Sequence, residues 1–428
     1  MLVTQLALGI LLGRPGVFSD AERNAVQEFW SAPGRLQTLG PADNQPPYVL
    51  MLTPAGSEWI NSANKKIRND REATQWIRDR VAYERSILGP IVDKQNSLFG
   101  IVSKEGRELT DVKDPGPPPD AIIQSVGTPR PFLQVQPNFR YKVTFDNSPP
   151  VVFEAVVRVQ DTYAYYRTDQ GVVYLGQPFK QFDPTSLSNL FKKAQTSESD
   201  MRVMKAVAML ESSFESFNSY DTGGLSIGFL QFATLDTGKG SLSPLLLEAK
   251  NLDPEEFQTY FRRYGIDVDP DRGLVVLDPV TGYETTGAEA IQLVRYDKRM
   301  SAVFVRAGRE SGSFQAAQIA YAFKAFMPTN DTFSLRLAGK QVTVAYRDIF
   351  QSEAGKATLL DRKVNTGTLK AVENAVQALA DKLKVKTIIE LTKHERELVQ
   401  AVTYRQGFLD DKTLSQPAHN AKYPRGSM

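Results

Sequence analysis

Two acidic residues near the middle of the chain have the types and the spacing that cleavage of a glycosidic bond requires. Glu211 follows a run of apolar residues at helical spacing, and Asp221 lies ten residues later in the turn sequence DTGG. Burial at a helix end penalises an ionised carboxyl, raises its pKa and keeps a proton available for a leaving oxygen. A carboxylate in a wetter turn stays ionised and activates water or stabilises an oxocarbenium-like centre. We therefore expect Glu211 to be the general acid and Asp221 the second carboxylate. Glu215, one helical turn after Glu211, is the rival acid, but its spacing to the turn suits the role less well.

A buried helix and a short hairpin are expected to position these carboxyl groups. Ser197 and Asp200 form a capping-box sequence where the helix begins. Apolar residues then recur at i, i+4, i+7 and i+11, which defines one buried face: Val203, Val207, Leu210 and Phe214. After Asn218 this periodicity stops. Residues 226–232 (SIGFLQF) are apolar and interrupted by a glycine, as in a hairpin that leads into the next helix.

This stretch resembles the catalytic core of the lysozyme-like superfamily, with features of two branches. LESSF (210–214) followed by GFLQF (228–232) resembles the soluble lytic transglycosylases and goose-type lysozymes, whereas YDTGGLSIG (220–228) resembles the phage-type lysozymes. The resemblance implies that Glu211 is the acid and that Asp221 with Thr222 positions or activates water. It also implies a set of substrate-binding residues: Tyr220, Ser226, Gly228, Gln231 and Asn365.

The sequence departs from the phage-type pattern after the second strand of this motif. Gly228-Phe229-Leu230 replaces the Gly-Ile-Gly-His of the phage enzymes, so no cleft histidine follows. If the lytic transglycosylase branch is the closer one, Glu211 alone does the acid and base work, and Asp221 is only a turn residue.

A second match lies downstream, in FQSEAGKATLLDRKVNTGT (350–368). It places Asp361, Asn365 and Gly367 in a helix-to-turn segment. This segment is similar to one that closes the far side of the cleft in several lysozyme-like and chitosanase-like hydrolases. Residues 321–328 are expected to form a core helix before it.

The composition excludes several other kinds of chemistry. The 428 residues include 51 Lys and Arg against 49 Asp and Glu, a formal net charge of +2, which gives no support to a nucleic-acid binder. The absence of cysteine excludes disulfides, a thiolate zinc site and a cysteine nucleophile. The two histidines, His394 and His419, are isolated from each other, which argues against a His-based zinc hydrolase or a Ser-His-Asp triad. We expect carboxylate chemistry with no metal and no organic cofactor.

The sequence predicts a multidomain chain that ends in a mainly α-helical, lysozyme-like domain with a small β-hairpin. Residues 1–65 are expected to form a helical module, in which LGRPGVFSDAERNAVQEFW and LTPAGSEWI are faintly similar to a peptidoglycan-binding repeat. Residues 66–120 are interpreted as a solvated, charged helix and a proline-rich linker. Period-two alternation in residues 130–186 predicts a small all-β, SH3-like module. Residues 197–408 form the expected catalytic domain and residues 409–428 a flexible tail.

The N-terminal sequence MLVTQLALGILLGRPG matches neither a secretory signal nor a membrane span. Its apolar stretch from Leu6 to Leu12 is interrupted by a glycine and has no basic residue before it. A signal peptide needs a positive region, and a span needs about 20 apolar residues. We expect a short helix here, no transmembrane segment, and action on the cell wall, in the periplasm or outside the cell, after export without a signal peptide.

Taken together, these features predict a muramidase or lytic transglycosylase that cleaves the β-1,4 bond between N-acetylmuramic acid and N-acetylglucosamine. Its expected partner is the glycan strand of peptidoglycan. Three alternatives stay open. The same fold can act on chitosan or chitin, the domain can be a non-catalytic component of a phage tail or secretion apparatus, or the chain can be an effector whose first half binds a partner protein.

Overall fold

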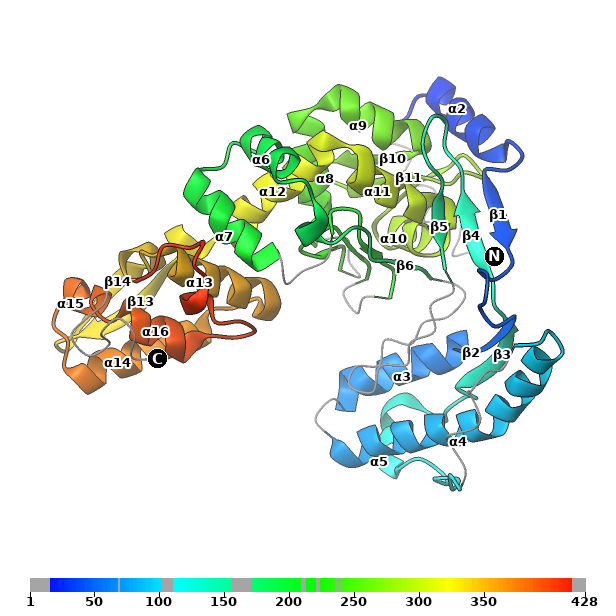
Figure 1. Cartoon of the computed structure of the whole chain (residues 1–428), viewed down its shortest axis with the longest axis horizontal. Helices are drawn as coiled ribbons and strands as arrows, with labels where there is room; N and C mark the ends of the chain where they lie inside the picture. Colours follow the sequence, from blue (N-terminus) through cyan, green and yellow to red (C-terminus); the bar gives the residue numbers. More distant parts are fainter. Residues whose placement is uncertain are drawn as a thin grey trace, which may run out of the picture.

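The chain forms several domains, with about 52% helix and several small antiparallel sheets, as the computed structural model in Figure 1 shows. The structure describes residues 16–67, 70–101, 111–154, 171–208, 213–220, 224–235, 238 and 240–417. Within these ranges, no helix has the length and apolar character needed to cross a membrane. The predictions of a multidomain chain and of no membrane-spanning helix hold for this part of the chain.

Three hydrophobic cores organise the described residues. The central core draws on segments between residues 18 and 327, together with a later helix at residues 353–366 and with Phe408 and Leu414 near the end of the described chain. The C-terminal core lies within residues 333–402, and the N-terminal lobe core lies within residues 52–133. These cores cut across the expected domain boundaries, because segments distant in sequence share one core.

The N-terminal lobe combines three helices with a two-stranded sheet, and Figure 1 shows it apart from the central helices. Its elements are β2 (Tyr48–Leu52), α3 (Pro54–Ile67), α4 (Arg71–Ser97), α5 (Asp120–Val126) and β3 (Leu133–Pro137). Trp59, Trp76 and Phe132 pack against one another, with ring centroids 5.5–6.2 Å apart. Trp76 and Val81 place a buried face on α4, so this charged helix is part of a core rather than solvated all round.

The strands of residues 130–186 pair mainly with strands outside that range. β3 pairs with β2, β4 (Arg140–Val143) lies between β1 (Leu36–Leu39) and β5 (Val151–Phe153), and β6 (Val173–Tyr174) pairs with a strand of the central domain. The described residues therefore do not show the expected self-contained SH3-like module. Period-two alternation identifies a strand, but it carries no information about a distant partner.

The helix α2 (Asp20–Ser31) belongs to the central domain. A capping box begins this helix, with Ser19 Oγ and the Glu22 carboxylate each accepting a hydrogen bond from the other residue's backbone N–H. Trp30 is buried in the central core and donates its indole N–H to Tyr264 O at 3.1 Å. Trp59, expected in the same module, packs in the N-terminal lobe instead. The peptidoglycan-binding-like repeat expected from residues 1–65 is therefore divided between two cores.

The central domain is mainly helical. Besides the β1-β4-β5 sheet, whose residues Val143, Val151 and Phe153 lie in its core, its described residues form two further small sheets. Its helices are α6 (Pro184–Lys193), α7 (Glu198–Ala208), α8 (Leu242–Leu252), α9 (Pro254–Tyr260), α10 (Gly287–Tyr296), α11 (Lys298–Glu310) and α12 (Gly312–Phe326). One sheet has the strand order β6-β7-β8-β9, where β7 is Phe217–Asn218, β8 Ser226–Ile227 and β9 Phe232–Ala233. The other is β10-β11-β12, formed by Ile266–Asp269, Gly273–Leu277 and Glu284–Thr286. Short 3₁₀ turns lie at Phe179–Gln181 (η1) and Arg262–Tyr264 (η2).

The C-terminal lobe packs a β-hairpin against helices. Its elements are η3 (Pro328–Asn330), β13 (Thr332–Leu337), β14 (Lys340–Ala345), η4 (Tyr346–Asp348), α13 (Glu353–Thr366), α14 (Lys370–Leu383), α15 (Ile388–Thr392), α16 (Glu395–Val402) and η5 (Phe408–Asp410). The helix α13 serves two cores, because Ala354, Ala357 and Leu360 pack in the central core and Leu359 in the C-terminal core. The range 197–408, expected to hold one core, therefore contains parts of two.

Candidate active site

The helix that precedes the candidate acid forms as the sequence predicts. Ser197 Oγ accepts the backbone N–H of Asp200 at 3.1 Å and donates to its carboxylate at 2.7 Å. Val203 and Val207 of the predicted apolar face are fully buried in the central core. Phe214, predicted on the same helical face, is also fully buried but lies in a turn beyond the helix.

The predicted catalytic residues lie outside the described residues. Glu211 falls in residues 209–212, together with Leu210 of the apolar face, and Asp221 and Thr222 fall in residues 221–223. The candidate site is therefore built from the elements that flank these two segments. β7 begins after the segment with Glu211 and ends before the turn with Asp221.

A three-stranded antiparallel meander follows helix α7, and it contains the predicted hairpin. Phe217 pairs with Ile227 between β7 and β8, and Ile227 pairs with Phe232 between β8 and β9. The turn between β8 and β9 requires Gly228, whose φ is +77° and whose missing Cβ would lie 2.2 Å from Gln318 Oε1. A side chain at this position is excluded both by backbone strain and by contact with the helix behind the turn.

Gln318 of α12 joins the two parts of this meander. Its side chain is fully buried, its amide nitrogen donates to Phe214 O at 2.9 Å, and its amide oxygen accepts the backbone N–H of Phe229 at 3.2 Å. Both backbone groups are buried and need a partner. Gln318 therefore holds the turn after α7 against the turn of the hairpin.

Two of the predicted substrate-binding residues hydrogen-bond within the meander. Ser226 Oγ donates to Gln231 Oε1 at 2.8 Å, and Gln231 Nε2 donates to Ser216 Oγ at 2.7 Å and Gly228 O at 3.1 Å. Gln231 also has a positive φ of 54°, which is uncommon for a residue other than glycine. Through these contacts, Gln231 and Ser226 stabilise the hairpin.

The other two predicted binding residues lie on different elements. The half-buried ring of Tyr220 lies against the backbone of Gly171, since a Cβ there would be 2.7 Å from Tyr220 Cζ. Asn365 is exposed near the end of α13 and donates its amide to Asp361 O at 2.7 Å. The buried carboxylate of Asp361 is held by Arg405, so the residues of the second motif mainly complete their own helix.

The helix α13 nevertheless lies against the helix that leads to Glu211. Arg202 of α7 donates three hydrogen bonds to the Glu353 carboxylate, one at 2.7 Å and two at 3.1 Å, and Ser415 donates its backbone N–H to the same carboxylate. These bonds hold the pKa of Glu353 near 2, against an ordinary value of 4.5. The second motif is thereby fixed beside α7.

Glu215 is a buried carboxyl within the candidate site. Its side chain lies in the turn between α7 and β7 and is 6% exposed. Oε1 accepts the backbone N–H of Gln177 at 2.8 Å, whereas Oε2 is buried with no hydrogen-bond partner. Burial raises the pKa of Glu215 above its ordinary value, because it penalises the ionised form.

Charged and titratable groups from two elements face Glu215. Glu310 of α11 raises the pKa of Glu215, whereas Arg309 of α11 and the N–H of Gln177 lower it. Tyr174 of β6 also lies close, and its own pKa is raised first by burial and then by the charge of Glu215. Together, burial and these neighbouring groups favour the protonated form of the Glu215 carboxyl.

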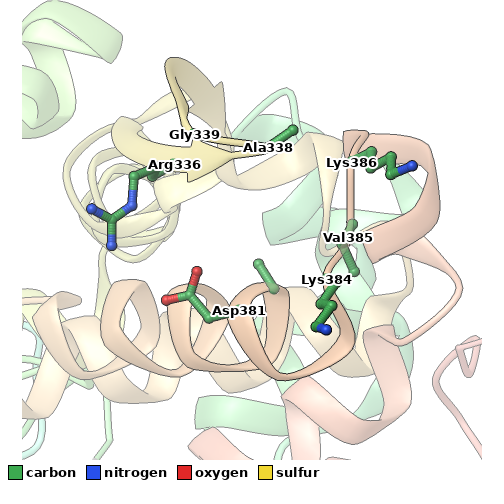
Figure 2. A pocket seen from close by; sticks show the side chains of 8 residues that line it. Arg336, Ala338, Gly339, Asp381, Lys384, Val385 and Lys386 are labelled. Atoms are coloured by element: carbon green, nitrogen blue, oxygen red, sulfur yellow. The ribbon is translucent and has the colours of Figure 1, made fainter.

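A cavity of about 310 Å³ lies in the C-terminal lobe, between the tip of the β13–β14 hairpin and the end of α14. Figure 2 shows Arg336 and Asp381 facing it from opposite sides, while Lys384 and Lys386 point in other directions. The three cations do not converge, so the cavity offers no shared anion site. Across the described ranges, no group of three or more His, Cys, Asp or Glu side chains is arranged to hold a metal ion.

Sequence reasoning ranked Glu215 below Glu211 and did not identify the residues that surround it. Gln318, Gln177 and Arg309 come from distant segments and belong to no local motif. One local signal indicates that Glu215 is buried: it directly follows Phe214, which belongs to the predicted apolar face.

Comparison with known proteins returned no relative of this chain. No family model, curated protein or solved structure matches it.

Proposed function

We propose that the chain is a peptidoglycan-cleaving glycoside hydrolase, a muramidase or a lytic transglycosylase. It acts on the β-1,4 bond between N-acetylmuramic acid and N-acetylglucosamine. The observation that carries this proposal is the order of the elements: helix α7, which is buried on one face, is followed by a buried turn and a three-stranded meander. The predicted acid, Glu211, belongs to the segment that connects these elements.

The order of the elements supports the proposal. A helix, a turn, a strand, the sequence DTGG, a second strand at Ser226–Ile227 and a glycine turn at Gly228 follow one another along the chain. This is the order that the lysozyme-like resemblance implies for an acid at the helix end and a second carboxylate in the turn after β7.

The environment beside the acid supports it as well. Residues 213–216 are all buried, and burial raises the pKa of the carboxyl among them. A low-dielectric surrounding of this kind keeps a carboxylic acid protonated near neutral pH. Glu211 comes two residues before this turn in the sequence, and in the proposed reaction it donates its proton to the leaving glycosidic oxygen.

The second half of the reaction distinguishes a muramidase from a lytic transglycosylase. In a muramidase, water positioned by Asp221 and Thr222 attacks the anomeric carbon, and one water molecule is consumed for each bond cleaved. In a lytic transglycosylase, a hydroxyl group of the muramic acid itself attacks, and the product is lighter by one water. Asp221 is needed only in the first case.

Lysis of purified peptidoglycan tests the proposal. Glu211→Gln should reduce the initial rate of dye release from labelled sacculi by at least about 100-fold, since general acid catalysis contributes about 10²–10⁴-fold. The matched control is Glu198→Gln on the exposed side of α7, which should retain the wild-type rate. Full activity in Glu211→Gln would remove this residue from the mechanism. Release from chitosan rather than sacculi would assign the alternative substrate, and no release from either would favour a non-catalytic role.

A further inference from the structure

A short segment crosses the turn that follows α7, and two hydrogen bonds hold it there. We call residues 174–177 the strap. Ser213 Oγ donates to Leu175 O at 2.8 Å, and Gln177 donates its backbone N–H to Glu215 Oε1 at 2.8 Å. Both partners belong to the turn, so the strap is tied to the chain directly after Glu211.

The strap lies in close contact with Glu215. Gly176 has a φ of +70°, and a Cβ there would lie 2.3 Å from Glu215 Cγ and 2.1 Å from Ser213 Oγ. Gly308 approaches from the opposite element, since its Cβ would lie 2.5 Å from Glu215 Cα. Glu215 is therefore enclosed between the strap and α11, and its carboxyl cannot reach bulk water without movement of one of them.

The outer surface of the strap is exposed next to this buried contact. The side chain of Leu175 is 70% exposed, although the residue's carbonyl is bonded to Ser213. Just beyond the strap, Phe179 packs on Phe214 and Phe229, with ring centroids 4.7 and 5.2 Å apart. The strap is thus anchored at its end by aromatic packing and along its length by Glu215 and Ser213.

We propose that Glu215 is a positioning residue, which holds the strap over the turn after α7 and thereby fixes residues 213–215, which follow Glu211 in the sequence. This inference rests on the proposed function for its catalytic meaning, but the strap contact itself does not. Glu215 does not deliver a proton to the substrate in this account.

Ionisation of Glu215 opposes the contact. Its buried Oε2 has no partner to receive a charge, and Glu310 repels a carboxylate, against the partial compensation of Arg309 and the Gln177 N–H. Tyr174 stays neutral in this range because its pKa is raised above 10. The strap should therefore be held most firmly at acidic pH and loosen as the pH rises through the raised pKa of Glu215.

Hydrogen exchange on the full-length protein tests the strap contact without any substrate. The amide of Gln177 is followed by mass spectrometry in wild type, Glu215→Gln and Glu215→Ala from about pH 4.5 to about pH 8. Glu215→Ala should lose about tenfold in protection relative to wild type at acidic pH, because the N–H loses its acceptor, and the difference should shrink at the higher pH where the wild-type strap loosens. Glu215→Gln keeps an oxygen acceptor without a charge, so it should restore protection and keep it at the pH where the wild type loosens.

Wall lysis is then measured on the same variants. Glu215→Gln should restore the activity lost in Glu215→Ala and shift the upper limb of the pH profile to higher pH. If Glu215→Gln is as inactive as Glu215→Ala while its strap stays protected, Glu215 acts through its proton and the inference is overturned. Equal strap protection in wild type and Glu215→Ala also overturns it.

Two controls keep the test decisive. Glu198→Ala on the exposed side of α7 should change neither protection nor lysis. If Glu215→Ala fails to fold, Glu215→Asp replaces it, since the shorter side chain withdraws the carboxyl from the Gln177 N–H, and the same loss of protection is expected. If the wild type shows no lysis at all, the proposed function fails, while the exchange result still decides the strap contact.

Discussion

At the scale of single residues, the candidate site depends on polar side chains that are buried and nearly all paired. Gln318, Gln231 and Ser216 satisfy buried groups of the meander, and their removal leaves those groups without partners. An unpaired buried donor or acceptor costs about 1–3 kcal/mol. The stability of the meander therefore rests on hydrogen bonds that no local sequence pattern reveals.

Gln318→Leu tests this dependence. The substitution keeps the volume but leaves the carbonyl of Phe214 and the N–H of Phe229 unpaired, so we expect a loss of about 2–4 kcal/mol in the free energy of unfolding. Urea unfolding monitored by circular dichroism measures it. A loss below about 0.5 kcal/mol would show that these groups find other partners.

Glu215 predicts how stability depends on pH. Its folded-state pKa is raised, so its neutral form stabilises the fold below the ordinary carboxyl pKa of 4.5, and this contribution is lost as the pH rises through the raised value. Glu215→Gln should therefore flatten the fall in unfolding free energy between pH 4.5 and the raised pKa of Glu215. If the unfolding free energies of the wild type and Glu215→Gln change in parallel with pH, the raised pKa of Glu215 is contradicted.

At the scale of elements, α7 is held in place both by contacts among residues close in sequence and by a contact with the distant helix α13. Its predicted cap and apolar face formed as expected because both are local patterns of three to four residues. Its partner α13 is joined to it by the pair of Arg202 and Glu353, which lie far apart in sequence. Such a pair has no local signature.

Arg202→Ala measures the strength of this connection. Glu353 is nearly buried whereas Arg202 is 41% exposed, so solvent screening weakens the pair. Removal of Arg202 still leaves a nearly buried carboxylate without its cation, and we expect a lower free energy of unfolding. Because the pKa of Glu353 is lowered to about 2, the contribution is present above pH 4.5 and is lost as the pH falls toward 2. The difference between the two proteins in urea should narrow between pH 7 and pH 3.

The matched control for this pair is Lys324→Ala. Its ammonium is 73% exposed and lies 3.5 Å from Glu248, so the change should cost less than about 0.5 kcal/mol. A similar loss in both variants would mean that Arg202 acts only as a surface charge.

At the scale of the whole molecule, the sequence predicts the elements better than their assembly. The capping box at Ser19, the cap at Ser197 and the hairpin at residues 226–233 each depend on residues that lie close together in the sequence. The pairing of β4 with β1 and the division of the C-terminal helices between two cores depend on segments about 100 residues apart or more. The candidate catalytic residues were assigned from resemblance, and that assignment stays a prediction.

The three cores predict the unfolding behaviour. The N-terminal lobe has a core of its own, whereas the central and C-terminal cores share α13. We expect calorimetry to show two transitions, one for the lobe and one for the rest. Phe132→Ala should lower the midpoint of one transition only, because removing a buried phenylalanine costs about 3–5 kcal/mol in its own core. A single transition that shifts as a whole would show that the lobe is not independent.

The most direct test of the account is the mass of the products released from purified peptidoglycan. The wild type should yield disaccharide-peptides that end in muramic acid, either hydrated or lighter by one water, and Glu211→Gln should yield none above background while Glu198→Gln yields the wild-type set. The same products from Glu211→Gln, or no glycan cleavage by the wild type, would contradict the central claim.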